Sequence, residues 1–221
     1  HAMNHIVLPS LLFDFRLSIP RCADPSPKTI GRLLSMPAGS QLFIPAAMND
    51  LPRFADVSVA WNPDGLAVVI SVKGKPMNPT GTSRDIKRSD VTLLWIDTRP
   101  AGNVHRATEY CHHFACLPVD EHQDNQPAVV VQPIAQQRTT RIDSSAKHIR
   151  TRTHLEKGGY DLEVWIPGTQ LHGFREITEI GRIGFYCVVQ DSNLGEQPLT
   201  LDDNFPTGYD PSMWVHLELT S

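Results

Sequence analysis

Residues 57–73 (VSVAWNPDGLAVVISVK) constrain the fold more than any other stretch of this sequence. Val57, Val59 and Trp61 alternate with small residues, which is the two-residue period of a β-strand with one buried face. The central NPDG combines a proline that fixes φ with a glycine that tolerates positive φ, so it favours a tight turn. Residues 66–72, a second run rich in β-branched residues, complete the stretch. We therefore predict a β-hairpin on which later strands pack.

Further alternating or β-branched segments follow the turn-rich stretches of the chain. They lie at residues 13–19, 42–44, 91–97, 106–117, 128–132, 138–152, 160–166, 181–191 and 213–219. The segment 91–97 is apolar on both sides, which indicates a central strand that is covered on both faces. A short helix is predicted within 26–36, where a proline occupies the first turn, and a helical turn at 167–174. The pattern predicts an all-β fold, a jelly-roll-like antiparallel β-sandwich of about ten or eleven strands with one or two short helices.

The length of 221 residues, of which 40% are hydrophobic, suffices for one large β domain. Regular strand patterning begins near residue 50. We therefore predict that residues 1–49 form an N-terminal extension packed on the core, and that residues 50–221 form the sandwich. The 18 prolines and 14 glycines suit many short strands better than long helices.

Composition also excludes several classes of function. The net charge of −4 gives no basic footprint, so we expect no nucleic-acid partner. No apolar run approaches the ~18 residues of a membrane-spanning helix, so no membrane partner is expected. The four cysteines (Cys22, Cys111, Cys116 and Cys187) are too sparse for a disulfide scaffold, and we expect reduced thiols.

Catalytic motifs are missing from the sequence, which contains no G-x-S-x-G, no H-E-x-x-H and no phosphate-binding loop. We therefore expect a protein that is not an enzyme. The alternative is a glycoside hydrolase that uses Asp161 and Glu163. These two carboxylates would lie on one side of a strand about 7 Å apart, a separation that inverting glycosidases use.

Three late strands place an aromatic side chain on the same side as polar side chains. The sets are Trp165 with Asp161 and Glu163, Tyr186 with Arg182 and Gln190, and Trp214 with His216 and Glu218. An aromatic face can pack against the C–H side of a pyranose while polar side chains fix its hydroxyls. These residues are therefore candidates for a saccharide site. The alternative is that the N-terminal segment or a loop covers each ring.

Four short motifs, taken in chain order, resemble the family 9 carbohydrate-binding modules and the related DOMON-like β-sandwiches. They are the Trp61 strand with its turn, Ser89-Asp90-Val91 leading into Trp95-Ile96-Asp97, Gly159-Tyr160-Asp161-Leu162-Glu163 running on to Leu171, and residues 181–191 ending in Gln190-Asp191-Ser192-Asn193. The similarity covers about residues 50–220. It implies a non-catalytic sugar site built on tryptophans, with Trp61 as a further ligand residue. It also implies structural calcium and an extracellular or periplasmic location.

The implied calcium would need six to eight oxygen ligands. Asp191, Asn193 and Asp202 are the predicted set, and Asp90 with Asp97 is a second possibility. None of these has EF-hand spacing. Asp and Asn residues also shape ordinary turns, which is the alternative explanation for their positions.

A histidine-rich stretch suggests a transition metal as a separate hypothesis. It reads Cys111-His112-His113-Phe114-Ala115-Cys116, with His105 and His122 nearby, and it lacks the spacing of a zinc finger. Strand alternation would also separate His112 from His113, which favours buried or hydrogen-bonded histidines instead. With the resemblance, the sequence favours a saccharide-binding domain that is similar to the family 9 modules. The alternative of another class is a structural or protein-interaction sandwich with no sugar site.

Overall fold

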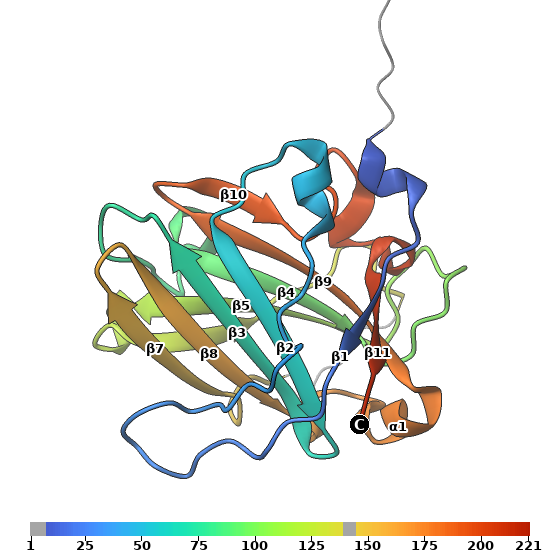
Figure 1. Cartoon of the computed structure of the whole chain (residues 1–221), viewed down its shortest axis with the longest axis horizontal. Helices are drawn as coiled ribbons and strands as arrows, with labels where there is room; N and C mark the ends of the chain where they lie inside the picture. The colour runs from blue at the N-terminus through green and yellow to red at the C-terminus, as the bar shows by residue number, and fades with distance from the viewer. Residues whose placement is uncertain (1–7, 139–144) are drawn as a thin grey trace, which may run out of the picture.

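The computed structural model describes residues 8–138 and 145–221. Part of the predicted N-terminal extension (1–7) and part of the predicted strand 138–152 (139–144) lie outside the described residues. Two β-sheets pack face to face, and in Figure 1 the four-stranded sheet lies in front of the seven-stranded one. Eleven strands are described, so the predicted β-sandwich is confirmed.

The seven-stranded sheet has the order β1-β11-β9-β4-β5-β6, with β10 paired to β9. Its strands are β1 (Arg16–Ile19), β4 (Val91–Asp97), β5 (Cys111–Asp120), β6 (Gln126–Val131), β9 (Arg182–Asp191), β10 (Gly195–Pro198) and β11 (Val215–Leu219). The four-stranded sheet has the order β2-β3-β8-β7. Its strands are β2 (Ala55–Asn62), β3 (Gly65–Lys73), β7 (Arg150–Glu156) and β8 (Gly159–Pro167).

Among the described residues, helical structure is confined to one short α-helix and eight short 3₁₀ segments. The α-helix is α1 (Ile177–Ile180), and the 3₁₀ turns are η1 (Pro9–Leu12), η2 (Pro45–Asn49), η3 (Ile86–Arg88), η4 (Glu121–Gln123), η5 (Gly168–Gln170), η6 (Phe174–Glu176), η7 (Pro206–Gly208) and η8 (Pro211–Met213). Across the described ranges, no helix has the length and apolar character needed to cross a lipid bilayer.

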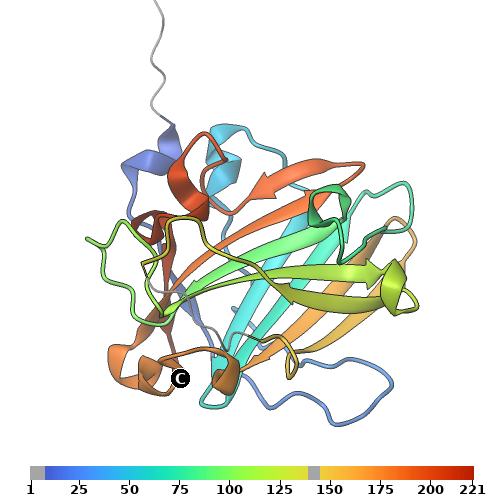
Figure 2. The same cartoon turned by 180° about the vertical axis from the view of Figure 1, so that it is seen from behind.

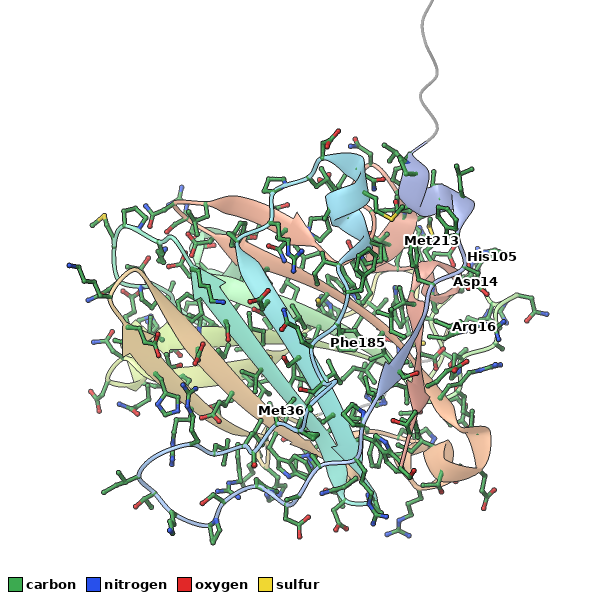
Figure 3. The ribbon with its side chains drawn as sticks, in the orientation of Figure 1. Asp14, Arg16, Met36, His105, Phe185 and Met213 are labelled. Atoms are coloured by element: carbon green, nitrogen blue, oxygen red, sulfur yellow. The ribbon has the colours of Figure 1, made fainter. Side chains whose placement is uncertain are left out.

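The predicted hairpin is confirmed as β2 and β3, which pair antiparallel from Ala55↔Val72 to Asn62↔Gly65. The predicted central strand is also confirmed, because β4 pairs with β5 on one edge and with β9 on the other. Alternate side chains of both sheets fill the space between them. Phe185 on β9, labelled in Figure 3, is one of the fully buried members of this core.

The N-terminal residues contribute an edge strand to one sheet and cover the outer face of the other. Strand β1 pairs with β11, and this pair is parallel, unlike the antiparallel arrangement expected throughout the sandwich. The chain then passes across the outer face of the four-stranded sheet, seen as the blue segment at the lower front of Figure 1. There Leu33 and Leu34 pack on Trp165, with Met36 beside them (Figure 3). The domain boundary at residues 49/50 stays a prediction.

The short helix predicted within residues 26–36 does not form, so that prediction was wrong. Gly31 has a φ of +88°, which lies outside the helical region. The backbone N–H groups of Leu33 and Leu34 donate to the Glu163 carboxylate at 3.1 and 2.9 Å instead of to a preceding helical turn. A tertiary acceptor therefore takes the hydrogen bonds that a helix would have used.

All four cysteines are free thiols in the structure, as expected. Cys111, Cys116 and Cys187 are buried, and Cys22 is partly exposed. Burial raises the pKa of Cys111 and of Cys187 to about 12, which keeps both thiols protonated and unreactive near neutral pH.

Candidate functional site

A groove of 570 Å³ lies on the outer face of the seven-stranded sheet. Figure 2 shows the molecule from this side, with β10 and the following red segment at the upper edge. The floor comes from outward-facing residues of β4 and β9, and the walls come from β10, the segment 199–214 and Leu51. The lining residues are Leu51, Leu93, Trp95, Tyr186, Val188, Gln190, Glu196, Pro198, Asp202, Asp203, Phe205, Thr207, Gly208 and Tyr209.

Strand register brings the two floor aromatics together. Trp95 on β4 lies directly opposite Tyr186 on β9, and their ring centroids are 5.3 Å apart with an interplanar angle of 45°. On the other side, the Trp95 ring stacks on His113 of β5 at 4.1 Å and 13°. Trp95 is 5% exposed, and its Nε1–H has no hydrogen-bond partner among the described residues. The floor is therefore a rigid aromatic surface with a spare donor at its base.

Tyr186 joins this floor to the wall of the groove. Its hydroxyl donates to the backbone carbonyl of Leu201 at 2.6 Å, and burial raises its pKa, so the hydroxyl stays protonated. At the mouth of the groove, Tyr209 is 37% exposed and Phe205 is half-buried. These two rings supply aromatic faces that a visiting molecule can reach.

Negative charge surrounds the groove. Glu196 and Asp203 are exposed, and Asp202 is half-buried and accepts hydrogen bonds from the backbone and side chain of Asn204. Among the described residues that line the groove, none is lysine or arginine. The groove therefore offers carboxylate acceptors and an unfavourable environment for an anionic ligand.

His113 makes a pH-dependent contribution to this region. Burial lowers its pKa to about 4, although a hydrogen bond with the Pro133 carbonyl opposes the shift. In the unfolded chain the imidazole would titrate near ~6.5. The unfolded state therefore binds the proton first as the pH falls, so stability is complete above ~6.5 and is lost between ~6.5 and ~4.

We expect His113→Phe to remove this part of the pH dependence. The free energy of unfolding of the wild type should fall between pH 7 and pH 4 by on the order of 2–3 kcal/mol more than that of the variant. Urea unfolding followed by tryptophan fluorescence at both pH values measures the difference, in which other titrating groups cancel. Equal losses in the two proteins would contradict the assignment.

The ligand residues predicted from the sequence occupy several places in the structure. Tyr186 lies in the groove. Arg182 begins the same strand about 13 Å away by strand geometry, opposite Glu218 of β11, and does not line the groove. Trp61 is a core residue, 8% exposed, whose Nε1–H donates to the Thr220 carbonyl at 3.0 Å.

Trp165 and Glu163 do share one side of β8, as predicted, but the N-terminal segment covers that side. Leu33 and Leu34 pack on Trp165, which is 5% exposed. Glu163 is 1% exposed and accepts from both of their N–H groups and from His154 Nε2 at 2.6 Å. For Trp165, the alternative given above therefore holds, in which the N-terminal segment covers the aromatic ring.

Asp161 and Glu163, the carboxylate pair suggested for a hydrolase, both contact the N-terminal segment. Asp161 Oδ2 lies 2.7 Å from Arg32 Nη1 of the N-terminal segment. Glu163 is sealed by the contacts just described. Both carboxylates therefore hold the N-terminal segment on β8.

Trp214 was expected to share an accessible outward side with His216, and the structure buries it instead, with 4% of its surface exposed. Its backbone is extended (φ −83°, ψ 143°) immediately before β11, which begins at Val215. Its Nε1–H donates to the Thr207 carbonyl at 2.7 Å. Trp214 thereby supports the wall of the groove from behind.

The residues predicted to bind calcium are divided between the two faces of the seven-stranded sheet. Asp191 shares the inward side of β9 with Val189, and Asp191 and Asn193 both contact the Lys75 ammonium. Asp202 lines the groove on the outer face. The second possibility, Asp90 with Asp97, is separated by the full length of β4. Calcium therefore stays a prediction, without a common site for its three residues.

The histidine-rich stretch is divided in the same way. His112 lies on the inner side of β5 with Phe114, whereas His113 lies on the outer side against Trp95. Cys116 is fully buried in the core. Within the described part of the chain, no group of three His, Cys, Asp or Glu residues is placed to hold a metal ion.

Sequence reasoning missed Trp95, Phe205 and Tyr209 as site residues. Trp95 belongs to the segment 91–97, which was expected to be covered on both faces because it is apolar on both sides. Only the β4–β9 register, which pairs it with Tyr186, shows that it floors a groove. A usable signal existed in the stretch DDNFPTGYD, where two aromatic residues accompany three carboxylates in a turn-rich loop.

Comparison with known proteins gives a match in structure alone. No protein-family profile matches the chain, and no curated protein matches it in sequence. A family 9 carbohydrate-binding module from Caldicellulosiruptor kristjanssonii in complex with cellotriose is similar over 94% of both chains, with a TM-score of 0.57 and 15% identity. A family 9 module from the same organism in complex with glucose is similar over 76% of both chains, with a TM-score of 0.52 and 16% identity. The chain therefore has the β-sandwich fold of family 9 carbohydrate-binding modules.

Proposed function

We propose that this protein binds a saccharide, without catalysing a reaction on it, in the groove on the outer face of the seven-stranded sheet. The observation that carries the proposal is the meeting of four aromatic side chains with three carboxylates in one 570 Å³ groove. Ligand sites commonly have this size and this mixture of apolar surface and a few polar groups. The similar folds found in complex with cellotriose and glucose support the same assignment.

The residues that line the groove would contribute to sugar binding in different ways. The exposed ring of Tyr209 and the half-buried ring of Phe205 would pack against the C–H face of a sugar and remove apolar surface from water. Asp202, Asp203 and Glu196 would accept hydrogen bonds from hydroxyl groups, and bonds to ionised acceptors are the stronger kind. Trp95 and Tyr186 would keep the floor of the groove rigid, which lowers the entropy cost of binding.

The charge of the groove favours one class of sugar. Three carboxylates without a lining lysine or arginine would repel a uronic acid, whose own carboxylate would have to approach them. Hydroxyl groups of a neutral sugar meet no such penalty. We therefore assign the site to neutral saccharides.

Titration calorimetry with glucose, cellotriose, xylotriose, mannotriose and trigalacturonic acid tests this function. We expect a neutral sugar to bind the wild type, and Tyr209→Ala to weaken that binding about 10-fold or more with little loss of stability, because the ring is exposed. Phe43→Ala, which removes another exposed ring outside the groove, is the matched control and should bind like the wild type.

A folded wild type that binds none of these sugars, or equal binding by wild type and Tyr209→Ala, would contradict the proposal. The burial of Trp61, Trp165 and Trp214 is the observation that favours the second candidate, a sandwich that serves only as a structural or protein-interaction domain. The absence of sugar binding in this panel would support that candidate.

A further inference from the structure

A fully buried lysine lies at one end of the sandwich. The side chains of Lys75, Asp90 and Asp191 are all 0% exposed. Lys75 Nζ lies 2.9 Å from Asp191 Oδ1 and 3.1 Å from Asp90 Oδ2. It also donates to Asn193 Oδ1 at 2.8 Å and contacts Ser192 Oγ at 3.4 Å. Four oxygens from two segments, Asp90 and residues 191–193, therefore surround one cationic nitrogen.

The position of this ammonium connects the two sheets. Lys75 follows β3 of the four-stranded sheet, and its backbone N–H donates to the Gly158 carbonyl at the β7–β8 turn. Asp90 precedes β4 and Asp191 ends β9, and both strands belong to the seven-stranded sheet. The contacts to Asp90 and Asp191 therefore fasten the end of one sheet to the end of the other.

The carboxylates are themselves held in place around the ammonium. Asp90 accepts from the Thr80 and Ser192 N–H groups at 2.7 and 2.6 Å. Asp191 Oδ1 accepts from the Asn193 and Leu194 N–H groups at 2.9 and 3.1 Å. A charge is buried without large cost only when it is paired and hydrogen-bonded in this way.

These oxygens are of the kind that calcium selects, since carboxylate, amide and hydroxyl oxygens are its usual ligands. They include Asp191 and Asn193, two of the three residues predicted to bind calcium from the sequence. The ammonium occupies the space between them, so a divalent cation would meet both its bulk and its positive charge. The residues as they stand do not fit a bound calcium ion.

We propose that the Lys75 ammonium takes the structural role of a bound cation in this domain, so that the fold needs no calcium. The side chain supplies one positive charge to two buried carboxylates and fastens the two sheets together. Removing it would leave two uncompensated carboxylates. Asp191 Oδ2 and the Tyr160 hydroxyl, both buried and without a hydrogen-bond partner among the described residues, would then be additional oxygens facing the vacated space.

Thermal unfolding with either EDTA or millimolar CaCl₂ tests this proposal in the intact chain. The melting temperature of the wild type should differ by less than about 1 °C between the two conditions, because the ammonium already occupies the oxygen cluster that calcium would need. Lys75→Ala should melt about 10 °C lower in EDTA, and calcium should restore a large part of that loss.

Two further variants serve as controls. Lys75→Met removes the charge but keeps the bulk, so it should be destabilised and calcium should not restore it. Lys73→Ala removes a lysine whose side chain is 74% exposed, two residues away, and should behave like the wild type. If Lys75→Ala folds only when calcium is present, that outcome also supports the proposal.

A wild type that is stabilised by calcium or destabilised by EDTA would overturn the proposal. So would a Lys75→Ala variant that loses no stability, or one that is destabilised but gains nothing from calcium. Should Lys75→Ala fail to fold under both conditions, the comparison of the wild type in EDTA and in calcium decides the matter. None of these measurements depends on sugar binding.

Discussion

Replacing Glu163 by alanine is expected to lower the free energy of unfolding by about 3 kcal/mol or more. The substitution removes the acceptor of three hydrogen bonds, from the Leu33 and Leu34 N–H groups and from His154. Each buried donor left without a partner costs roughly 1–3 kcal/mol. Urea unfolding measures the loss, and Glu179→Ala, at an exposed position of α1, is the control.

The same variant should loosen one identified segment. Residues 20–36 are held on β8 by Glu163, by Arg32 with Asp161, and by the packing of Leu33 and Leu34 on Trp165. We expect limited trypsin digestion of Glu163→Ala to cleave after Lys28 and Arg32 faster than in the wild type, before the sandwich itself unfolds. Unchanged stability together with unchanged cleavage would show that Glu163 does not hold the segment.

Replacing Trp95 by alanine is expected to have the second large effect. The ring packs between His113 and Tyr186, so its removal leaves a cavity beneath the groove and costs about 3–5 kcal/mol. Sugar binding should also be lost, because the floor that positions Tyr186 and the 199–214 wall is no longer rigid. Urea unfolding and titration calorimetry with the sugar that binds the wild type measure the two effects.

Trp95→Phe separates loss of the ring from loss of its size. It keeps an aromatic side chain between the same neighbours, so most of the stability and a weakened affinity should remain. Sugar binding by Trp95→Ala with the affinity of the wild type would place the ligand elsewhere on the protein. That result would leave the stability argument intact.

The N-terminal segment covers the outer face of the four-stranded sheet, whereas the groove lies on the outer face of the seven-stranded sheet. The N-terminal segment seals the outer face of β8, where the sequence suggested an aromatic and polar surface. The seven-stranded sheet keeps part of its outer face open between β10 and the 199–214 segment. Of the six predicted ligand residues, Tyr186 is therefore the one that lines the groove.

The alternation of side chains was sufficient to predict the local structure. It identified the hairpin of β2 and β3, the central strand β4 and the side of β8 that carries Glu163 and Trp165, because a strand's two faces follow from sequence parity alone. It did not show that Trp214 is buried against the 199–214 segment, and local patterning failed at residues 26–36, where a distant carboxylate takes the hydrogen bonds of the expected helix.

The amino-acid sequence by itself determined the β-sandwich, its hairpin and the parity of its strands, since these depend on neighbours two residues apart. Only the tertiary structure decided which faces are covered, because Glu163 meets Leu33 across 130 residues and Trp95 meets Tyr186 through strand register. The same holds for Lys75, which lies 116 residues before Asp191. Parity states which side a residue faces, whereas long-range packing decides whether that side meets solvent, a sugar or a buried ammonium.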